Sequence, residues 1–123
     1  MDRTYLDIAR KWGVVLAWDI DRDDLDELAS WLDALSCPKK DIADALRVIM
    51  RKDTGFTFSN PDLRMSLVCI GYATSDEQWL DTLIHELDHV QATVCRYYDV
   101  ALDSEDAAYL IGYMARLVRK QCR

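Results

Sequence analysis

Long apolar runs, basic charge and closely spaced cysteines are all missing from this sequence. No stretch approaches the roughly 18 to 20 apolar residues that cross a bilayer, and the first residues lack the apolar segment of a signal peptide. Lys and Arg number 15 against 22 Asp and Glu, a formal charge of -7 that excludes a protein held to nucleic acid mainly through phosphate contacts. The four cysteines stand 26 to 32 residues apart, which predicts neither a disulfide framework nor a zinc site built from cysteine pairs. We therefore expect a cytoplasmic protein with neither a membrane nor a nucleic-acid partner.

The length and composition fit one folded domain. The chain has 123 residues, half of them hydrophobic, which is enough for one core and too few for two. We expect a single domain of the α+β class over residues 1–123, mostly helical with one short β-hairpin. Its first part, residues 1–52, is expected to be N-terminal helices. Residues 53–123 are expected to hold the hairpin and two further helices.

Two structures fit residues 4–18. Apolar side chains at positions 5, 8, 12 and 15 have helical spacing, whereas the continuous apolar run 13–18 fits a buried strand equally well. Each of the next two segments, 21–37 and 38–50, carries an apolar stripe of helical period. Pro38 suits the first turn of the second helix, so we expect the two to form an antiparallel pair.

The rest of the chain predicts a hairpin followed by two helices. Turn residues separate the short runs 55–59 and 63–71, which have strand composition. Ser75 and Gln78 have the spacing of a capping box at the start of a long amphipathic helix that reaches about Tyr98. After a break, Ser104 can cap a last helix that carries apolar side chains as far as about Val118.

Both histidines of the chain lie in the long helix, within the sequence His85-Glu86-Leu87-Asp88-His89. A separation of four residues puts the two imidazoles on one helix face, about 6 Å apart along the axis, where both can bind one zinc ion. Glu86 projects about 100° away from His85 and is placed to act as a general base on metal-bound water. The HExxH pattern therefore predicts a Zn2+ site with hydrolytic chemistry.

A catalytic zinc takes three protein ligands, so one more residue is needed. The chain has no third histidine. Glu105 is the leading candidate because it begins the next helix 16 residues after His89, on a face with small residues that permit close approach. The remaining candidates are the acidic residues nearby: Asp99, Asp103 and Asp106.

Together, His85, Glu86, His89 and Glu105 resemble a minimal gluzincin metallopeptidase. The pattern, which covers about residues 54–118, is similar to that of small phage- and prophage-borne metallopeptidases, and more distantly to ImmA/IrrE-type proteins. The resemblance implies a zincin-like fold. It also implies that His85, His89 and Glu105 bind zinc and that Glu86 is the general base.

The same resemblance implies a place for the substrate. An extended peptide or protein segment is expected to pair along an edge strand that begins at Leu67 and ends at Gly71. The resemblance therefore favours a zinc metallopeptidase. Two other functions stay open: a zincin-derived protein-binding module that retains a structural zinc, and a helical interaction protein without metal.

Two details of the motif need an explanation. Asp88 places a charge where peptidases of this type usually have an uncharged residue, so we expect it to be exposed to solvent or paired with Arg96 or Arg64. An oxyanion needs a hydrogen-bond donor, and the phenols of Tyr109 and Tyr113 are available. We take Tyr109 as the catalytic candidate, with aromatic packing at the helix surface as the alternative for both.

Overall fold

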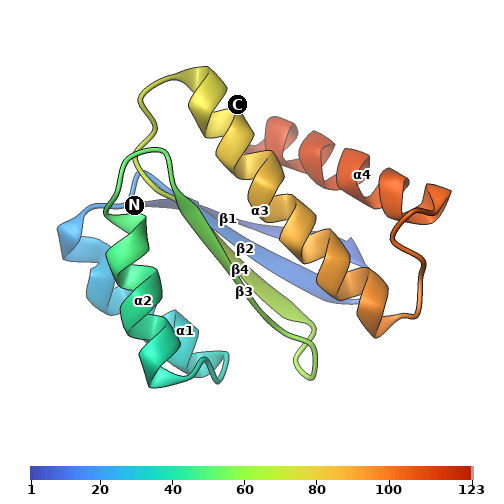
Figure 1. Ribbon diagram of the computed structural model, residues 1–123, viewed down its shortest axis with the longest axis horizontal. Helices are drawn as coiled ribbons and strands as arrows, with labels where there is room; N and C mark the ends of the chain where they lie inside the picture. The colour runs from blue at the N-terminus through green and yellow to red at the C-terminus, as the bar shows by residue number, and fades with distance from the viewer. Residues whose placement is uncertain (123) are drawn as a thin grey trace.

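The computed structural model describes residues 1–122 and has a four-stranded sheet with helices on both sides (Figure 1). The strands are β1 (Asp2–Ala9), β2 (Trp12–Trp18), β3 (Gly55–Asn60) and β4 (Met65–Ile70). The helices are the short 3-10 helix η1 (Arg22–Asp24), α1 (Leu25–Ala34), α2 (Lys39–Ile49), α3 (Asp76–Tyr97) and α4 (Glu105–Cys122). The predicted α+β class is confirmed.

The sheet is built from two hairpins joined side by side. Its strand order is β1-β2-β4-β3, with antiparallel pairs at both sides and a parallel pair, β2 and β4, in the middle. The predicted hairpin at residues 55–71 is present as β3 and β4. The expectation of a single hairpin is wrong, because the N-terminal residues form a second one.

Of the two structures that fit residues 4–18, the strand is the one present: these residues form β1 and β2, and no helix. The apolar run 13–18 is a strand with both faces covered, and Val14, Leu16 and Ala17 are fully buried. A strand that is buried on both faces reads as a continuous apolar run rather than as an alternation. Residues 1–52 therefore contain two strands as well as the predicted pair of helices, α1 and α2.

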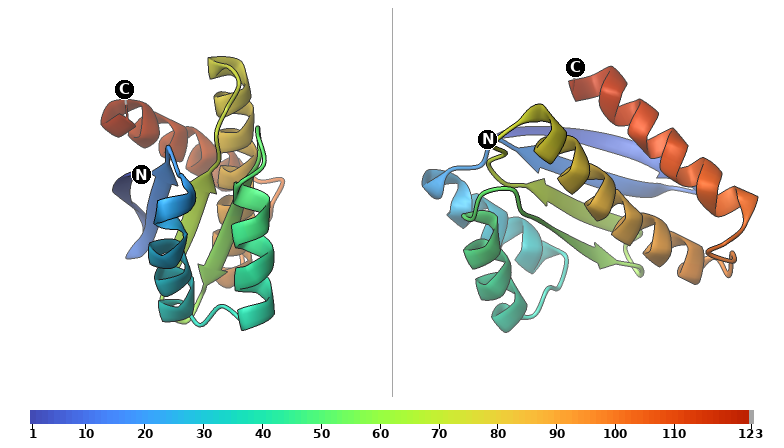
Figure 2. Two further views of the ribbon diagram at one scale, coloured as in Figure 1. Left: turned by 90° about the vertical axis from the view of Figure 1, so that its left-hand side faces the viewer. Right: turned by 45° about the horizontal axis from the view of Figure 1, so that its top comes forward.

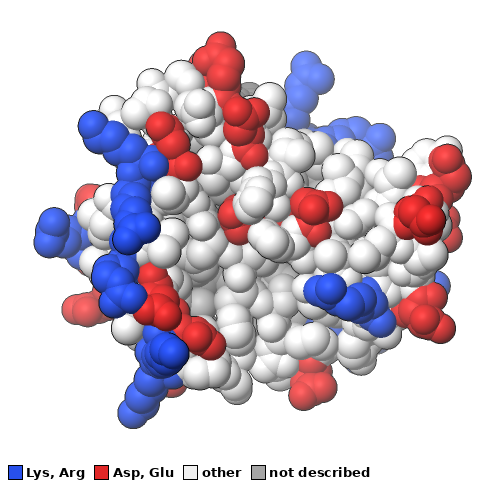
Figure 3. Space-filling model, in the orientation of Figure 1, with Lys and Arg blue, Asp and Glu red and all other residues white. Residues whose placement is uncertain are grey.

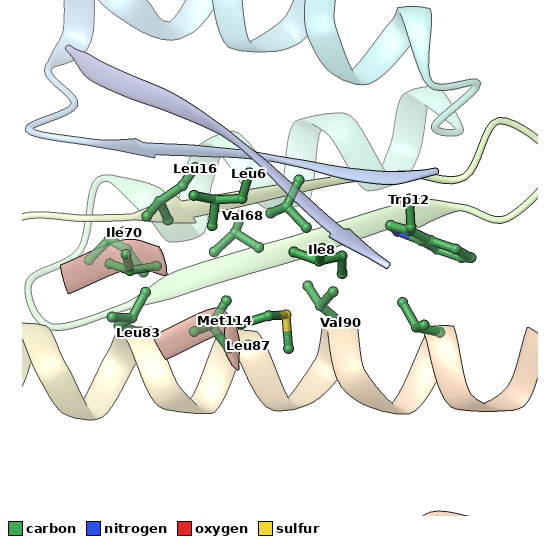
Figure 4. Close-up of a cluster of buried hydrophobic side chains, with 13 residues drawn as sticks. Leu6, Ile8, Trp12, Leu16, Val68, Ile70, Leu83, Leu87, Val90 and Met114 are labelled. Atoms are coloured by element: carbon green, nitrogen blue, oxygen red, sulfur yellow. The ribbon is translucent and has the colours of Figure 1, made fainter. Parts of the chain in front are cut away.

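Helices α1 and α2 cover one face of the sheet, and α3 and α4 cover the other (Figures 1 and 2). The core under α3 and α4 is apolar and includes these buried residues: Leu6, Ile8, Trp12, Leu16, Val68, Ile70, Leu83, Leu87, Val90 and Met114 (Figure 4). The core under α1 and α2 has its own buried set: Ala17, Ile20, Leu28, Leu32, Cys37, Ile49, Leu67 and Cys69. Both helical layers are thus fixed to a common sheet by apolar burial.

The strand predicted to form the substrate-binding edge is an interior strand. Residues 65–70 are β4, which pairs with β3 on one side and with β2 on the other, where Leu67 faces Val15. The prediction of an edge from Leu67 to Gly71 is therefore wrong. The edge strand beside α3 is β3, and the opposite edge is β1.

Side-chain caps fix where α3 and α4 begin. The Ser75 hydroxyl accepts a hydrogen bond of 3.1 Å from the Gln78 backbone N–H, as the capping pattern predicts. The Ser104 hydroxyl accepts one of 3.2 Å from the Ala107 N–H. Within the described part of the chain, none of the helices combines the length and apolar character needed to cross a membrane.

Candidate functional site

Helix α3 has one buried face and two flanks with different neighbours. Leu83, Leu87 and Val90 point into the core beneath the helix. One flank faces the edge strand β3, and the other faces α4. The histidine motif lies on the flank that faces β3, and that flank is only partly covered by protein.

A groove of about 460 Å3 runs between β3 and α3. One wall is formed by five consecutive residues of β3, Gly55 to Ser59. The other wall is formed by side chains of α3 with helical spacing: His85, Glu86, His89, Thr93 and Arg96. The structure therefore places the whole His-Glu-His constellation in one concave surface beside an edge strand.

Small residues on β3 allow Glu86 to lie close to the strand. A Cβ atom at Gly55 would come within 2.7 Å of the Cys69 carbonyl oxygen, 2.9 Å of Thr82 Cγ2 and 3.1 Å of Glu86 Cγ. The strand alternates small residues with Phe56 and Phe58, which pack into the core under α1 and α2. Because side chains alternate along a strand, the small residues face α3.

Glu86 is the buried acid of the groove. Its residue is 5% exposed, and its carboxylate Oε1 accepts a hydrogen bond of 2.8 Å from the Thr57 hydroxyl. The other oxygen, Oε2, lies 3.9 Å from Nε2 of His85. One carboxylate oxygen is therefore held by the strand while the other faces the imidazole, an arrangement that suits a group that accepts and returns a proton.

The two histidines lie together and open to solvent. Their rings meet edge to face with centroids 5.0 Å apart, and the His85 side chain is 70% exposed. The backbone carbonyl of His89 accepts a hydrogen bond from the Thr93 hydroxyl one turn later. Two adjacent imidazoles on one helix face can supply two nitrogen ligands to a single ion.

Glu105 and Tyr109 belong to α4, which packs on the other flank of α3, away from the histidines. Helix α4 docks there, where the Gln91 amide donates a hydrogen bond of 3.1 Å to the Ala107 carbonyl oxygen. Neither Glu105 nor Tyr109 lines the groove at β3. Tyr109 is 72% exposed and borders a different pocket, between α4 and the turn at Arg10. The structure thus brings His85, Glu86 and His89 together and leaves the other two predicted site residues apart from them.

The remaining acidic candidates also lie outside the groove. Asp99 and Asp103 follow α3 in the connection to α4, and neither lines the groove wall. Asp106 is close enough to Cys95, on the α4 side, that its charge adds to burial in raising the pKa of that thiol. Asp88 is exposed and forms no ion pair within residues 1–122, which matches the expectation of a solvated charge.

The side chains of the groove can supply two of the ligands that a zinc ion needs. His85 and His89 offer two imidazole ligands, and Glu86 stands beside them. Across residues 1–122, no group of three or more His, Cys, Asp or Glu side chains is arranged to hold a metal ion. His85 and His89 could therefore supply two of the three protein ligands of a catalytic zinc, and the described residues supply no third one beside them.

Sequence reasoning missed the wall that faces the histidines. Gly55, Thr57 and Ser59 alternate with Phe56 and Phe58, and this contrast of small and large side chains marks one face for close approach. It named Arg96 only as a possible partner of Asp88 and missed its place in the groove, although Arg96 follows His89 by seven residues and so lies on the same helix face. The sequence contains both signals: the two-residue alternation of small and large side chains on the strand, and the seven-residue spacing on the helix.

Comparison of the chain with protein-family models, with curated proteins and with solved structures gives no match.

Proposed function

We propose that the protein is a zinc-dependent hydrolase that acts on an extended peptide segment in the groove between β3 and α3. His85 and His89 hold the metal, and Glu86 is the general base. The observation that carries the proposal is the placement of Glu86: its carboxylate is buried, is held by Thr57 and faces His85 within the groove.

The chain's own groups divide the work of hydrolysis. His85 and His89 would hold the zinc ion, which would supply Lewis acidity to the attacking water and to the carbonyl. Oε2 of Glu86 takes the proton from the attacking water, because Oε1 is engaged by the Thr57 hydroxyl. The same carboxyl group then passes the proton to the leaving nitrogen. Burial and the hydrogen bond from Thr57 restrict the positions that the Glu86 carboxylate can take.

The edge strand supports a peptide as the substrate. An edge strand presents backbone N–H and C=O groups that an extended peptide can pair with, as in recognition by strand addition. Strand β3 is such an edge, and it forms one wall of the same groove as the histidines. A peptide paired with β3 passes directly by His85 and Glu86.

A second function is favoured by the ligand count. Catalytic zinc sites use three protein ligands, and the groove offers two histidines. A protein-binding module that retains the ion and pairs with a partner strand needs the edge and the metal but no turnover. We keep this as the alternative.

Glu86→Gln separates the two functions. The variant removes the proton acceptor and keeps the shape of the side chain and an oxygen that can accept from Thr57. We expect wild type and variant to bind equal zinc, and only wild type to cleave a quenched fluorescent peptide library in the presence of zinc. Glu77→Gln, an exposed change near the start of α3, is the matched control and is expected to cleave like wild type. Equal zinc and equal peptide binding without cleavage by any of the three proteins would favour the binding module.

A further inference from the structure

Arg96 occupies the far end of the groove. It is an exposed residue in the last turn of α3 and lines the groove together with His85, Glu86 and His89. Seven residues separate it from His89, which is about 10 Å along the helix axis at 1.5 Å per residue. The groove therefore has a metal-binding position near one end and a cation near the other.

The guanidinium of Arg96 has no carboxylate partner within the described chain. The ion pairs found there use Arg3, Arg47, the N-terminal amine and His85. This is notable in a protein with 22 acidic side chains and a formal charge of -7. Figure 3 shows basic atoms over the C-terminal end of α3 and, toward the centre of the same face, uncharged surface with some acidic atoms among it. An exposed, unpaired arginine beside a groove is suited to bind a carboxylate through two parallel hydrogen bonds.

The direction of β3 shows how far along a bound peptide Arg96 would lie. Strand β3 and helix α3 run the same way (Figure 1), with Gly55 and Thr57 beside Glu86 and Ser59 farther along the groove toward Arg96. A peptide paired with β3 advances about 3.3 Å per residue. The 10 Å between His89 and Arg96 therefore corresponds to about three residues of extended peptide.

We propose that Arg96 is a specificity residue that binds a carboxylate of the peptide substrate about three residues beyond the point at which the peptide passes His89. This inference rests on the proposed binding of an extended peptide along β3. The carboxylate can belong to the free C-terminus of a short peptide or to an Asp or Glu side chain within a longer one. Both sources present the same planar anion to the guanidinium.

A binding experiment on the full-length, zinc-loaded Glu86→Gln protein tests the proposal without turnover. The probes are N-terminally fluorescein-labelled eight-residue peptides of alternating Thr and Val. One has a C-terminal acid and one a C-terminal amide, and two further series of amides carry Glu or Gln at successive positions along the chain. Affinity is measured by fluorescence anisotropy, and the binding site is mapped through the backbone amide NMR shifts of Gly55–Asn60.

We expect at least one carboxylate peptide to bind about tenfold more tightly than its uncharged counterpart, with a preference that weakens as salt is raised. The acid and the scanned Glu peptides show which source of carboxylate is used. Arg96→Gln is expected to abolish the preference, so that carboxylate and uncharged peptides bind with equal affinity. Arg116→Gln, which removes an exposed arginine on α4, is the control and is expected to keep the preference.

Each other outcome overturns a defined part of the account. Peptide binding at β3 with no carboxylate preference, or with a preference that Arg96→Gln leaves intact, overturns the role of Arg96 and leaves the proposed function standing. Failure of all the peptides to shift the β3 amides, in wild type as well as in the variants, overturns the proposed peptide function and this inference together.

Discussion

The hydroxyl of Thr57 donates a hydrogen bond of 2.8 Å to the carboxylate of Glu86, across the space between an edge strand and the helix that carries both histidines. This bond joins two segments that are 29 residues apart in the sequence. It fixes the acid of the HExxH motif to the wall of the groove. The geometry of the proposed base thus depends on β3 as much as on α3.

Removal of this donor is expected to destabilise the fold. Thr57→Val keeps the shape of the side chain and leaves a buried carboxylate oxygen without its partner, so we expect the free energy of unfolding to fall by about 1–3 kcal/mol. Thr57→Ser keeps the hydroxyl and is expected to stay closer to wild type. Urea denaturation of the three proteins at neutral pH measures the difference. Equal stability of Thr57→Val and wild type would show that the bond does not hold Glu86.

Alanine substitutions at two glycines are expected to change the stability of the fold in opposite directions. At Gly55 the new Cβ would lie 2.7 Å from a backbone oxygen, which cannot move aside, so we expect Gly55→Ala to cost about 1–3 kcal/mol. Gly112 lies within α4, and apart from its chain neighbours and the backbone of its own helix no atom lies within 4 Å of the corresponding position. Gly112→Ala is therefore expected to stabilise the fold by about 0.5–1 kcal/mol through helix propensity. Thermal or urea unfolding of both variants is the measurement, and destabilisation by Gly112→Ala would contradict the placement of α4.

The thiol of Cys69 is expected to make stability depend on pH in the alkaline range. Burial, and then the charge of Glu86, raise the pKa of this thiol in the folded protein. The folded chain keeps the proton while the unfolded chain releases it above about pH 8.5, so this contribution is complete below that pH and is lost as the pH rises. We expect wild type to lose about 1.4 kcal/mol per pH unit more than Cys69→Ala above pH 8.5. Parallel curves for the two proteins between pH 7 and 10 would contradict a buried thiol.

The helices were predictable from sequence because their signals are local. The apolar stripes, the Ser75 cap and the Ser104 cap lie within the segments that they specify. The first hairpin was not predictable from sequence, because its turn does not contain the residues that are typical of hairpin turns. Arg10 and Lys11 both have positive φ, at 46° and 66°, where glycine or asparagine is usual. Distant contacts hold them, since the Tyr98 hydroxyl donates to the Arg10 carbonyl oxygen and its ring lies under the guanidinium.

The site, like the fold, was predictable from sequence only where it depends on local spacing. The His85, Glu86 and His89 side chains share a groove because one helix places them there, and helix geometry follows from sequence spacing. Which flank of α3 receives α4 depends instead on the order of strands in the sheet, and that order depends on the pairing of β2 with β4. The prediction that Glu105 faces the histidines required this long-range information, and the structure puts α4 on the other flank.

Zinc content tests the central claim most directly. Protein purified without added zinc is analysed by inductively coupled plasma mass spectrometry as wild type, His85→Ala, His89→Ala and Glu105→Ala. We expect about one zinc per chain in wild type and in Glu105→Ala, and loss of the metal in both histidine variants, because the groove supplies these two ligands and not Glu105. A zinc-free wild type, or zinc retained in both histidine variants, would contradict the claim that His85 and His89 form the metal site.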